Sequence, residues 1–304
     1  MLDVRRLRLL LELAHRGTIA AVAEALAYTP SAVSQQLAVL EREAGVPLLE
    51  RAGRRVALTP AGAVLARSTE PVLAALEEAS AALAATGTGL AGPLRIGAFP
   101  TAARTILPPA LVALGRDHPG LELMVIELDP VAVPAALRAG ALNAALTHDY
   151  DYVPMEPDPV LDTEPLLEET VYLATAGERP APPEGIIWAH REAPWIVGSP
   201  DTMCHAMVVR ACQAVGFTPR IRHHADDFAT VLALVAAGQG VAFVPQLGAL
   251  GVPAGVTLTP LPTRRRTRIA CRRGTRHHPA VAAFAAAIRE SAGSYARAAG
   301  SVRR

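Results

Sequence analysis

Apolar residues begin to recur at helical spacing close to the N-terminus of this chain. Asp3 can cap a first helix, because a carboxylate accepts the free amide hydrogens at a helix start. The apolar positions that follow at intervals of three and four residues would form its buried face: Val4, Leu7, Leu11 and Ala14. The N-terminal segment is therefore predicted to be an amphipathic helix.

A second short helix is predicted from Ile19 to about Ala27. Gly17 can adopt the positive φ that ends the first helix, and the hydroxyl group of Thr18 can cap the second. Its packing face would consist of small side chains that let a third helix cross closely: Ala20, Ala23 and Ala27.

The third helix begins with the pair Thr29-Pro30, a hydroxyl cap followed by proline at the first helical position. One apolar stripe consists of Val33, Leu37, Leu40 and Ala44. The opposite face carries small or uncharged side chains: Ser31, Ser34, Gln35 and Ala38. Such a face suits close approach to base edges and phosphates in a DNA major groove. The two helices thus indicate a helix-turn-helix DNA reader, in which Thr29 and Pro30 also lie near the DNA.

A short basic hairpin is predicted directly after these helices, with residues 48–51 and 54–58 flanking Ala52-Gly53. Arginines lie near its tip: Arg51, Arg54 and Arg55. A wing of this kind can lie along phosphates, so residues 1–58 are interpreted as a winged helix-turn-helix domain. The alternative is a solvated helix pair followed by an ordinary charged turn.

A long helix is predicted from Thr59-Pro60 to about Thr86, within a linker region of residues 59–90. Apolar residues at intervals of seven and four would form an antiparallel dimer seam: Leu65, Val72, Leu76, Ala79 and Leu83. At ~1.5 Å per residue the helix would reach about 42 Å, enough to separate two DNA-binding heads. Pro71 should kink or interrupt it. The alternative is a helix that packs on its own domain.

From Gly92 the pattern changes to alternating strands and helices, which predicts a largely parallel sheet flanked by helices. The first predicted elements are strand 94–99, helix 102–118, strand 121–128, helix 131–139 and strand 144–147. A second unit would comprise strands 170–174, 195–198, 220–223 and 241–245 with helices 202–215 and 228–237. A last strand, 268–272, and helix 279–291 complete the pattern.

Taken together, these motifs resemble the LysR-type transcriptional regulators. The resemblance rests on AHRGTIAAVAEALAYTPSAVSQQLAVLEREAGVPLLER, RRVALTPAG, GPLRIGAFPT and LVAAGQGVAFVP, which cover nearly the whole chain in the family's order. The family often has Gln-Pro where this chain has Pro30-Ser31. A base contact that the family assigns to that glutamine therefore does not transfer to position 30.

The resemblance implies an α+β multidomain fold: a winged helix-turn-helix, a linker helix and a two-lobed α/β effector domain like a periplasmic binding protein. Its first lobe would comprise residues 91–163 with 268–304, and its second residues 164–267. Crossings near Asp162–Pro165 and Arg264–Arg268 would form the hinge.

Ligands of open α/β sheets bind beyond the carboxyl ends of strands and near helix N-termini. By this rule the predicted effector-binding residues are Pro100, Thr101, Ala102, Thr147, His148, Thr202, Asp226 and Phe228. Thr101 is the leading candidate because a hydroxyl group at a helix start can bind a carboxylate, although a plain N-cap explains it equally well. Asp226 or Asp227 fits a helix cap better than a ligand contact. If either faces the cleft, the ligand should carry an amine or another donor.

Composition narrows the classes of protein to which this chain can belong. The net charge is +1, and residues 1–58 hold eight arginines against six acidic residues, so any basic surface must be local. The chain has no lysine, so arginines, amides and hydroxyl groups must supply phosphate contacts. No apolar run reaches the ~20 residues that span a bilayer, and no secretory signal is visible at the N-terminus. We expect a cytoplasmic protein without membrane contact.

Several further features favour structural interpretations. The adjacent pairs His223-His224 and His277-His278 are poor chelates, because neighbours on a strand point to opposite faces. The run TRRRTRIACRRGTR is interpreted as a solvated edge strand and hinge return. Three cysteines fit a reducing compartment and show no metal-ligand spacing. We expect no metal and no cofactor other than a small-molecule effector of unknown identity.

No catalytic motif is visible, so an enzyme is not expected. A solute-binding protein or enzyme of the two-lobed fold remains an alternative, but such a protein would not need residues 17–58. In another alternative, oxidation of Cys204 and Cys212 switches the same DNA reader, since peroxide-sensing members of the family hold a redox pair there. The spacing here is one residue shorter, and eight residues of intact helix separate the two by about 12 Å.

The prediction is therefore a homo-oligomeric transcriptional regulator. As the resemblance implies, a dimer or tetramer would bind interrupted palindromic sites on double-stranded DNA. A small effector between the lobes would shift the angle between DNA heads, and RNA polymerase is expected as a further partner.

Overall fold

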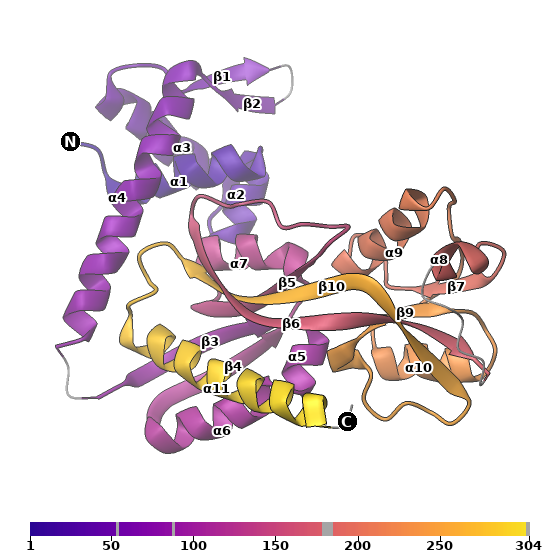
Figure 1. The fold of residues 1–304 in the computed structure, drawn as a ribbon. Coiled ribbons are helices and arrows are strands. Elements are labelled where there is room, and N and C mark those ends of the chain that lie inside the picture. The colour runs from indigo at the N-terminus through magenta and orange to yellow at the C-terminus, as the bar shows by residue number, and fades with distance from the viewer. Residues whose placement is uncertain (53–54, 87–88, 178–184, 302–304) are drawn as a thin grey trace.

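A computed structural model describes residues 1–52, 55–86, 89–177 and 185–301 of the chain. Three parts follow one another: an N-terminal head, a long helix along one side of the molecule, and a larger α/β region (Figure 1). The head comprises α1 (Val4–Arg16), α2 (Ile19–Ala25), α3 (Pro30–Ala44), β1 (Leu49–Ala52) and β2 (Arg55–Leu58). The long helix is α4 (Pro60–Ala84).

The three head helices begin and end where local signals predict. The carboxylate of Asp3 accepts the amides of Arg5 and Arg6 at 2.9 and 3.1 Å. Thr18 and Thr29 cap α2 and α3 through their hydroxyl groups, each at 3.2 Å from an amide nitrogen. Gly17 ends α1 with φ of 73°. These side chains satisfy amide groups that a helix start leaves free, so the predicted helix starts are confirmed.

The core of the head lies between α1, α2, α3 and α4. Val33, Leu37 and Leu40 of the predicted stripe on α3 are buried. On α1 the predicted face is only half right, because Val4 and Ala14 are exposed while Leu9, Leu10 and Leu13 are buried. The reason is that α1 packs between α3 on one side and α4 on the other, which buries a wider stripe than one helix face. Likewise Ala20 and Ala27 of the second helix are exposed, and only Ala23 of the three alanines is buried.

The predicted hairpin is present. Strands β1 and β2 pair antiparallel, with Arg51 opposite Val56. Glu41 of α3 fixes its position, since one carboxylate oxygen accepts the amides of Leu48 and Leu49 at 2.9 and 3.0 Å. Arg54 lies outside the described residues, and only the backbone of Arg55 is described.

Pro71 was predicted to kink or interrupt this helix. Helix α4 runs past Pro71 as one helix, so the predicted interruption is wrong, while the kink stays a prediction. Proline removes one amide donor, but tertiary packing holds the turns on both sides. Small side chains on one face of α4 are buried against the rest of the chain: Ala66, Thr69, Ala74 and Ala81. The other face leaves large apolar side chains exposed, namely Val64, Val72, Leu76 and Leu83.

The α/β region is built on one six-stranded sheet in the order β4-β3-β5-β10-β6-β9. These strands are β3 (Ala91–Ala98), β4 (Gly120–Glu127), β5 (Ala144–Tyr150), β6 (Leu161–Ala176), β9 (Ala242–Pro245) and β10 (Val256–Arg272). Strands β7 (Pro194–Val197) and β8 (Arg220–His224) form a separate parallel pair.

The sheet was predicted to be largely parallel, and this is wrong for the part formed by β10, β6 and β9. Strand β3 pairs parallel with β4 and β5, but β10 pairs antiparallel with β5 and β6, and β6 pairs antiparallel with β9. Parallel neighbours in a sheet need a crossover connection, usually a helix, whereas antiparallel neighbours do not. The long strands β6 and β10 pair antiparallel with each other and with their other neighbours. They contain the predicted hinge segments Asp162–Pro165 and Arg264–Arg268, which pair with each other in part. The crossings are thus hydrogen-bonded strands.

Helices cover both faces of the sheet and group into two lobes (Figure 1). The first lobe holds β3–β5 with α5 (Pro100–Arg104), α6 (Leu107–Asp117), η1 (Pro130–Ala132), α7 (Val133–Ala139) and α11 (Pro279–Ser301). The second lobe holds β7–β9 with α8 (Ile186–Ala189), α9 (Met203–Ala214), α10 (Phe228–Ala236) and η2 (Gln246–Gly248).

The single helix predicted for residues 102–118 is in fact two helices, α5 and α6. Pro108 and Pro109 occupy the first turn of the second one. Proline fits a first helical turn, where no amide donor is needed, but breaks a helix interior. Helix α5 is thus a short separate helix that starts directly after β3, where the predicted site begins.

Gly62 offers a test of how the head joins α4. A methyl group at this position would overlap the carbonyl oxygen of Leu48, a backbone atom that cannot move freely. We expect Gly62→Ala to lower the free energy of unfolding by about 1–3 kcal/mol, as overpacking does. Gly115→Ala is the matched control, because a methyl group on this helical glycine meets only ordinary contact with Leu123. Urea denaturation followed by circular dichroism measures both, and equal stability of the two variants would contradict the close approach.

Candidate functional site

The predicted DNA-reading residues lie together on the outer face of α3. Ser31, Ser34, Gln35 and Ala38 are exposed, and so are Thr29 and Pro30 at its start. The Thr29 and Ser31 hydroxyl groups lie 3.1 Å apart. Arg51 is exposed on β1. A helix with this uncharged face beside a hairpin has the shape of a groove-reading unit.

The head also contacts the first lobe of the same chain. Arg8 donates to the carbonyl oxygen of Arg138 at 2.9 Å, and Arg16 to that of Ala135 at 3.4 Å. Both acceptors belong to α7: Ala135 lies in the helix, and Arg138 lies in its last turn, where carbonyl groups lack intrahelical donors. His15 lies beside them, and burial, followed by the charge of Arg138, lowers its pKa. None of these contacts was predicted, since they join residues that are far apart in the sequence.

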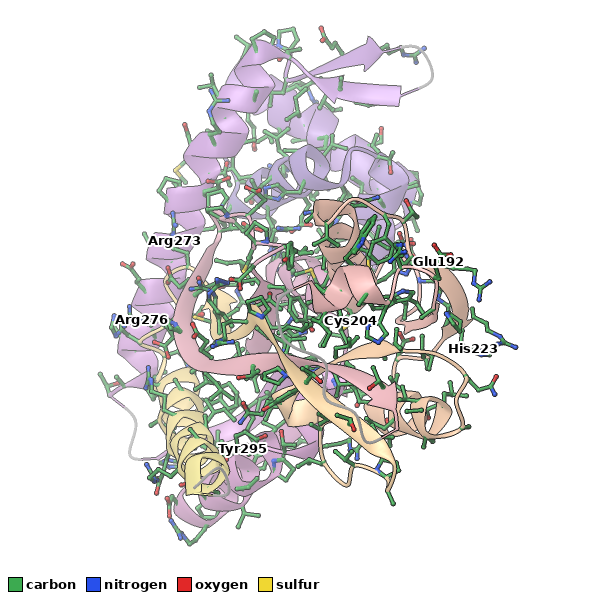
Figure 2. All side chains as sticks on the ribbon, turned by 45° about the vertical axis from the view of Figure 1, so that its right-hand side comes forward. Glu192, Cys204, His223, Arg273, Arg276 and Tyr295 are labelled. Carbon is green, nitrogen blue, oxygen red and sulfur yellow. The ribbon has the colours of Figure 1, made fainter. Side chains whose placement is uncertain are left out.

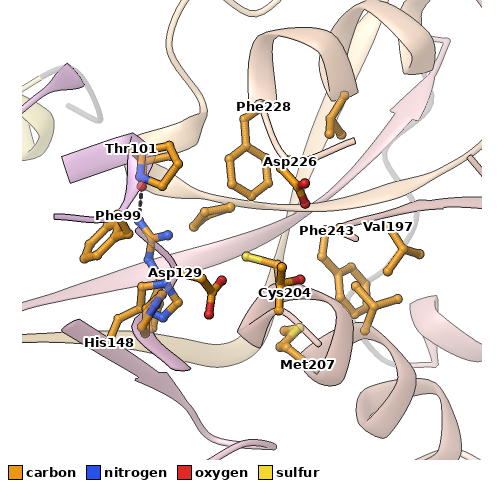
Figure 3. A pocket seen from close by; sticks show the side chains of 18 of the residues that line it. Phe99, Thr101, Asp129, His148, Val197, Cys204, Met207, Asp226, Phe228 and Phe243 are labelled. Carbon is orange, nitrogen blue, oxygen red and sulfur yellow. Dashed lines mark hydrogen bonds between the residues drawn. The ribbon is translucent and has the colours of Figure 1, made fainter. Parts of the chain in front are cut away.

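A cavity of about 210 Å³ lies between the two lobes (Figure 3). Six of the eight predicted effector residues line it: Pro100, Thr101, His148, Thr202, Asp226 and Phe228. Ala102 is instead fully buried in the core of the first lobe. Thr147 lines a different hollow beside α7, which His148 also borders. These two placements correct the prediction.

The floor of the cavity carries a buried ion pair between the crossing strands. Arg265 of β10 and Glu169 of β6 are directly opposite, and each side chain is only 1% exposed. Nη2 of Arg265 lies 3.0 and 2.9 Å from the two carboxylate oxygens, and 3.0 Å from Oγ1 of Thr101. Burial is the largest influence and lowers the pKa of Arg265, but Glu169, Tyr150 and Cys204 together outweigh it, and the pKa is raised.

This ion pair corrects one sequence-based interpretation. The arginine run was expected on a solvated edge strand, yet β10 is a central strand and Arg265 faces inward. The hydroxyl oxygen of Thr101, a predicted ligand contact, accepts a hydrogen bond from Arg265, and its hydrogen can still be donated to a ligand. Alternation along β10 could have suggested that one arginine of the run is buried, but no local signal identifies Glu169 as its partner.

The two aspartates before α10 have different partners. Asp227 caps α10 through the amide of Ala229 at 3.2 Å and also pairs with Arg104 of the first lobe at 2.9 Å. Asp226 accepts hydrogen bonds from the amide and hydroxyl groups of Ser199, at 2.7 and 2.6 Å. Asp226 also lines the cavity. This corresponds to the alternative in which one of the two aspartates faces the cleft.

Two of the three cysteines, Cys204 and Cys212, lie on one unbroken helix, α9, whereas Cys271 lies on β10. In the view of Figure 2, Cys204 lies toward the middle of the molecule and Glu192 toward its edge. Cys204 lines the cavity and its sulfur lies 3.5 Å from the hydroxyl oxygen of Tyr150. Burial raises the pKa of the Cys204 thiol, and raises the pKa of Cys212 to about 12. The thiolate is the reactive form, so both cysteines are held in their less reactive form near neutral pH.

His148 is a neutral group in the cavity wall. Its ring packs edge-on against Phe99 and Tyr150, with centroids 4.6 and 5.1 Å away. Nδ1 is buried and has no hydrogen-bond partner in the structure. Burial, followed by the charge of Arg265, lowers the pKa of His148 well below its ordinary value.

The described ranges contain no group of three or more His, Cys, Asp and Glu side chains arranged to hold a metal ion. Within those same ranges, no helix is both long and apolar enough to cross a membrane.

Comparison with known proteins matches both parts of the chain. The family described as a bacterial regulatory helix-turn-helix protein of the lysR family matches residues 4–63, and the LysR substrate binding domain matches residues 87–293. A probable hydrogen peroxide-inducible genes activator of Mycobacterium avium is 31% identical over 247 residues, 79% of this chain and 76% of that protein. The regulator TtuA of Agrobacterium vitis is 29% identical over 272 residues, 88% of this chain and 86% of that protein.

Solved structures show the same arrangement of parts. A cysteine mutant of OxyR from Corynebacterium glutamicum is similar with a TM-score of 0.58 and 26% identity, covering 99% of this chain and 95% of that chain. Full-length CbnR in complex with its target DNA has a TM-score of 0.53 at 21% identity, covering 95% of this chain and 100% of that chain. The second likeness concerns the fold alone.

His148 makes stability depend on pH in a defined direction. In the unfolded chain a histidine gains a proton below a pKa of about 6.5, whereas the buried ring stays neutral. Its contribution to stability is therefore complete above about pH 7 and is lost as the pH falls through 6.5. Between pH 7.5 and 5.5 we expect the wild type to lose about 1.4 kcal/mol more unfolding free energy than His148→Phe.

Urea denaturation at both pH values measures this difference. His277→Phe, at an exposed position, is the matched control and should keep the wild-type pH dependence. Equal pH dependence of wild type and His148→Phe would show that the buried ring takes up a proton in the folded protein.

Proposed function

The chain belongs to the LysR family of bacterial transcriptional regulators, and from this premise we propose how its head and its cleft work together. The protein is a DNA-binding transcriptional regulator with an effector-binding domain. The family consists of regulators and not of enzymes, which confirms the prediction from the missing catalytic motifs.

In this proposal, a small molecule binds in the cavity between the lobes and changes how the protein binds its operator. The observation that supports this most directly is that both lobes contribute to one enclosed lining, the first through Thr101 and His148 and the second through Asp226 and Phe228. A ligand in that position contacts both lobes at once. It shifts the equilibrium between arrangements of the lobes only if it binds one of them more tightly.

The segment η1–α7 gives such a shift a route to the DNA-binding head. Pro130, at its start, lines the cavity, while carbonyl groups of α7 accept the hydrogen bonds from Arg8 and Arg16 of α1. A change in the lobe angle that moves this segment therefore also moves the surface against which the head packs. This route requires that the contact with the cavity and the contact with the head are both made within one protomer.

The proposal assigns base and phosphate contacts to the exposed face of α3, with Ser31, Ser34 and Gln35 nearest the DNA. Arg51 on the hairpin would bind phosphate. Arg54 and Arg55 keep the same proposed role on the sequence evidence alone.

Self-association is part of the proposal. Val64, Val72, Leu76 and Leu83 leave an apolar face on α4 exposed, and such a face is stabilised when a second copy covers it. A dimer would present two heads to an interrupted palindrome. We propose that this dimer, or a tetramer built from it, acts in the cytoplasm, where DNA and RNA polymerase are present. A regulator without catalytic groups must change transcription through that polymerase or through access to the promoter.

The names of some relatives refer to hydrogen peroxide, so a redox signal is the second candidate. Cys204 does line the cavity, but burial raises the pKa of its thiol and of the Cys212 thiol. The two residues also lie on one unbroken helix, which a disulfide would have to unwind. For these reasons we propose a bound effector as the signal.

Electrophoretic mobility of the protein on DNA from its own upstream region, with excess non-specific competitor, tests the base-reading face. We expect Ser34→Ala/Gln35→Ala to lose retention by roughly tenfold or more, because each good base contact contributes about 1–3 kcal/mol of discrimination. Gln213→Ala, which removes an exposed amide group from α9 in the second lobe, is the matched control and should bind like the wild type. Unchanged specific binding by the double variant would remove this face of α3 from the interface. If even the wild type fails on this fragment, a genomic fragment library replaces it, and failure there would contradict specific DNA reading.

The salt dependence of DNA binding distinguishes the proposed phosphate contact of the hairpin from the proposed base contacts of α3. Arg51→Ala should weaken binding on all DNA sequences and reduce the slope of log affinity against log salt by about 0.9, since one phosphate contact releases that many counterions. Arg116→Ala, an equally charged change on exposed α6, should leave the slope unaltered. An unchanged slope in Arg51→Ala would exclude this arginine from the phosphate contacts.

A further inference from the structure

Two carboxylates from opposite lobes face the same cavity. Asp129 follows β4 in the first lobe and caps η1, accepting the amide of Val131 at 3.0 Å. Asp226 follows β8 in the second lobe and is held by Ser199. Both line the cavity, and Figure 3 shows them among the side chains around Cys204. Asp129 was not predicted, although Asp129-Pro130 repeats the cap-plus-proline signal seen at Thr29-Pro30.

The structure supplies no cation to balance these carboxylates. Among the residues that the structure describes, the ion pairs include neither Asp129 nor Asp226, nor Glu127, a third acid in the lining. The one arginine in the lining is Arg265, and its charge is already balanced by Glu169. His148 is held neutral. The cavity therefore has a neutral floor and an acidic wall.

The surroundings of Asp129, including the charge of Asp226, make it less stable as an anion. Burial, opposed by the amides of Val131 and Met203, raises the pKa of Asp129, and the charge of Asp226 raises it further. Like charges that face one cavity repel, and a cation between them removes that repulsion. The wall thus favours a positively charged group.

The rest of the lining is apolar and largely aromatic or branched. It includes Phe99, Met207, Val231, Phe228 and Phe243. The cavity of about 210 Å³ is smaller than the roughly 300–1,000 Å³ typical of sites for drug-sized ligands. Ring faces near an acidic wall also attract cations through their quadrupoles. The lining suits a ring-sized apolar body with one charged end.

We infer that the effector is a small amine, with its ammonium group between Asp129 and Asp226 and its apolar body against Phe228, Phe243 and Met207. This inference rests on the proposed role of the cavity as the effector site. The ammonium group bridges the two lobes, because one carboxylate belongs to each. Binding therefore stabilises the arrangement in which Asp129 and Asp226 are close, which is the population shift that regulation requires.

Three phenylalkyl probes of similar size but different charge test the inference on the full-length protein. They are 2-phenylethylamine, the neutral 2-phenylethanol and the anionic 3-phenylpropionate. We expect the amine to raise the melting temperature and to give a measurable Kd by titration calorimetry at pH 7.5. The alcohol should bind roughly 10- to 100-fold more weakly, the range that hydrogen bonds to a charged group are worth.

Charge-removing variants locate the ammonium group. Asp129→Asn and Asp226→Asn should each weaken the amine by roughly 10- to 100-fold and leave the alcohol almost unaffected. Asparagine still caps a helix start, so Asp129→Asn is expected to fold, and melting without a ligand checks this. Asp117→Asn, an exposed change at the end of α6, is the matched control and should bind the amine like the wild type.

Several outcomes would overturn the inference. Binding of 3-phenylpropionate but not of the amine would show that the effector is an acid, while leaving the cavity as the effector site. Amine binding that survives both asparagine changes would place the amine elsewhere. If no probe binds, the assignment of an amine fails, whereas the mobility experiments on the head judge DNA reading independently.

Discussion

The ion pair between Arg265 and Glu169 is the interaction on which the two-lobed region depends. Its partners lie on β10 and β6, the two strands that pass from one lobe to the other, and both are almost fully buried. Removing one partner of such a pair leaves an uncompensated charge, which costs about 3–5 kcal/mol. The pair also holds Thr101 at the start of α5, and Glu169 accepts the amide of Leu247 at the start of η2 at 2.8 Å. One pair of charges thus joins both crossing strands, the start of α5 and the start of η2.

The properties of the cavity follow from this pair. Among the described residues of the lining, Arg265 is the only arginine, and Glu169 balances its charge. The acids of the wall therefore decide the electrostatic character of the site. The cavity is also connected mechanically to the DNA-binding head, since η1–α7 contacts the cavity at one end and the arginines of α1 at the other. The same antiparallel strands that form the floor therefore place the site within reach of the part of the molecule that binds DNA.

Local signals were sufficient where the governing interaction is local. The caps at Asp3, Thr18 and Thr29 act within three residues, so the sequence predicts them correctly. The rule that ligands bind beyond strand ends and near helix starts placed six of eight residues around the cavity. It failed for Ala102 and Thr147, because the direction of a side chain depends on the turn of helix or face of strand that neighbouring elements cover. It missed Asp129, although the sequence contains the cap-plus-proline signal Asp129-Pro130.

By itself, the sequence determined the helix-turn-helix, the hairpin, the long helix and the alternating α/β pattern, since these depend on spacing and turn chemistry. Only the tertiary structure decided that Pro71 stays within a continuous helix, that β10 is central, and that Arg265 is buried. The last decision is the most consequential, because Arg265 and Glu169 are 96 residues apart. An arginine is stable inside a protein only when a distant segment brings a carboxylate to it, and no local pattern reports which segment that will be.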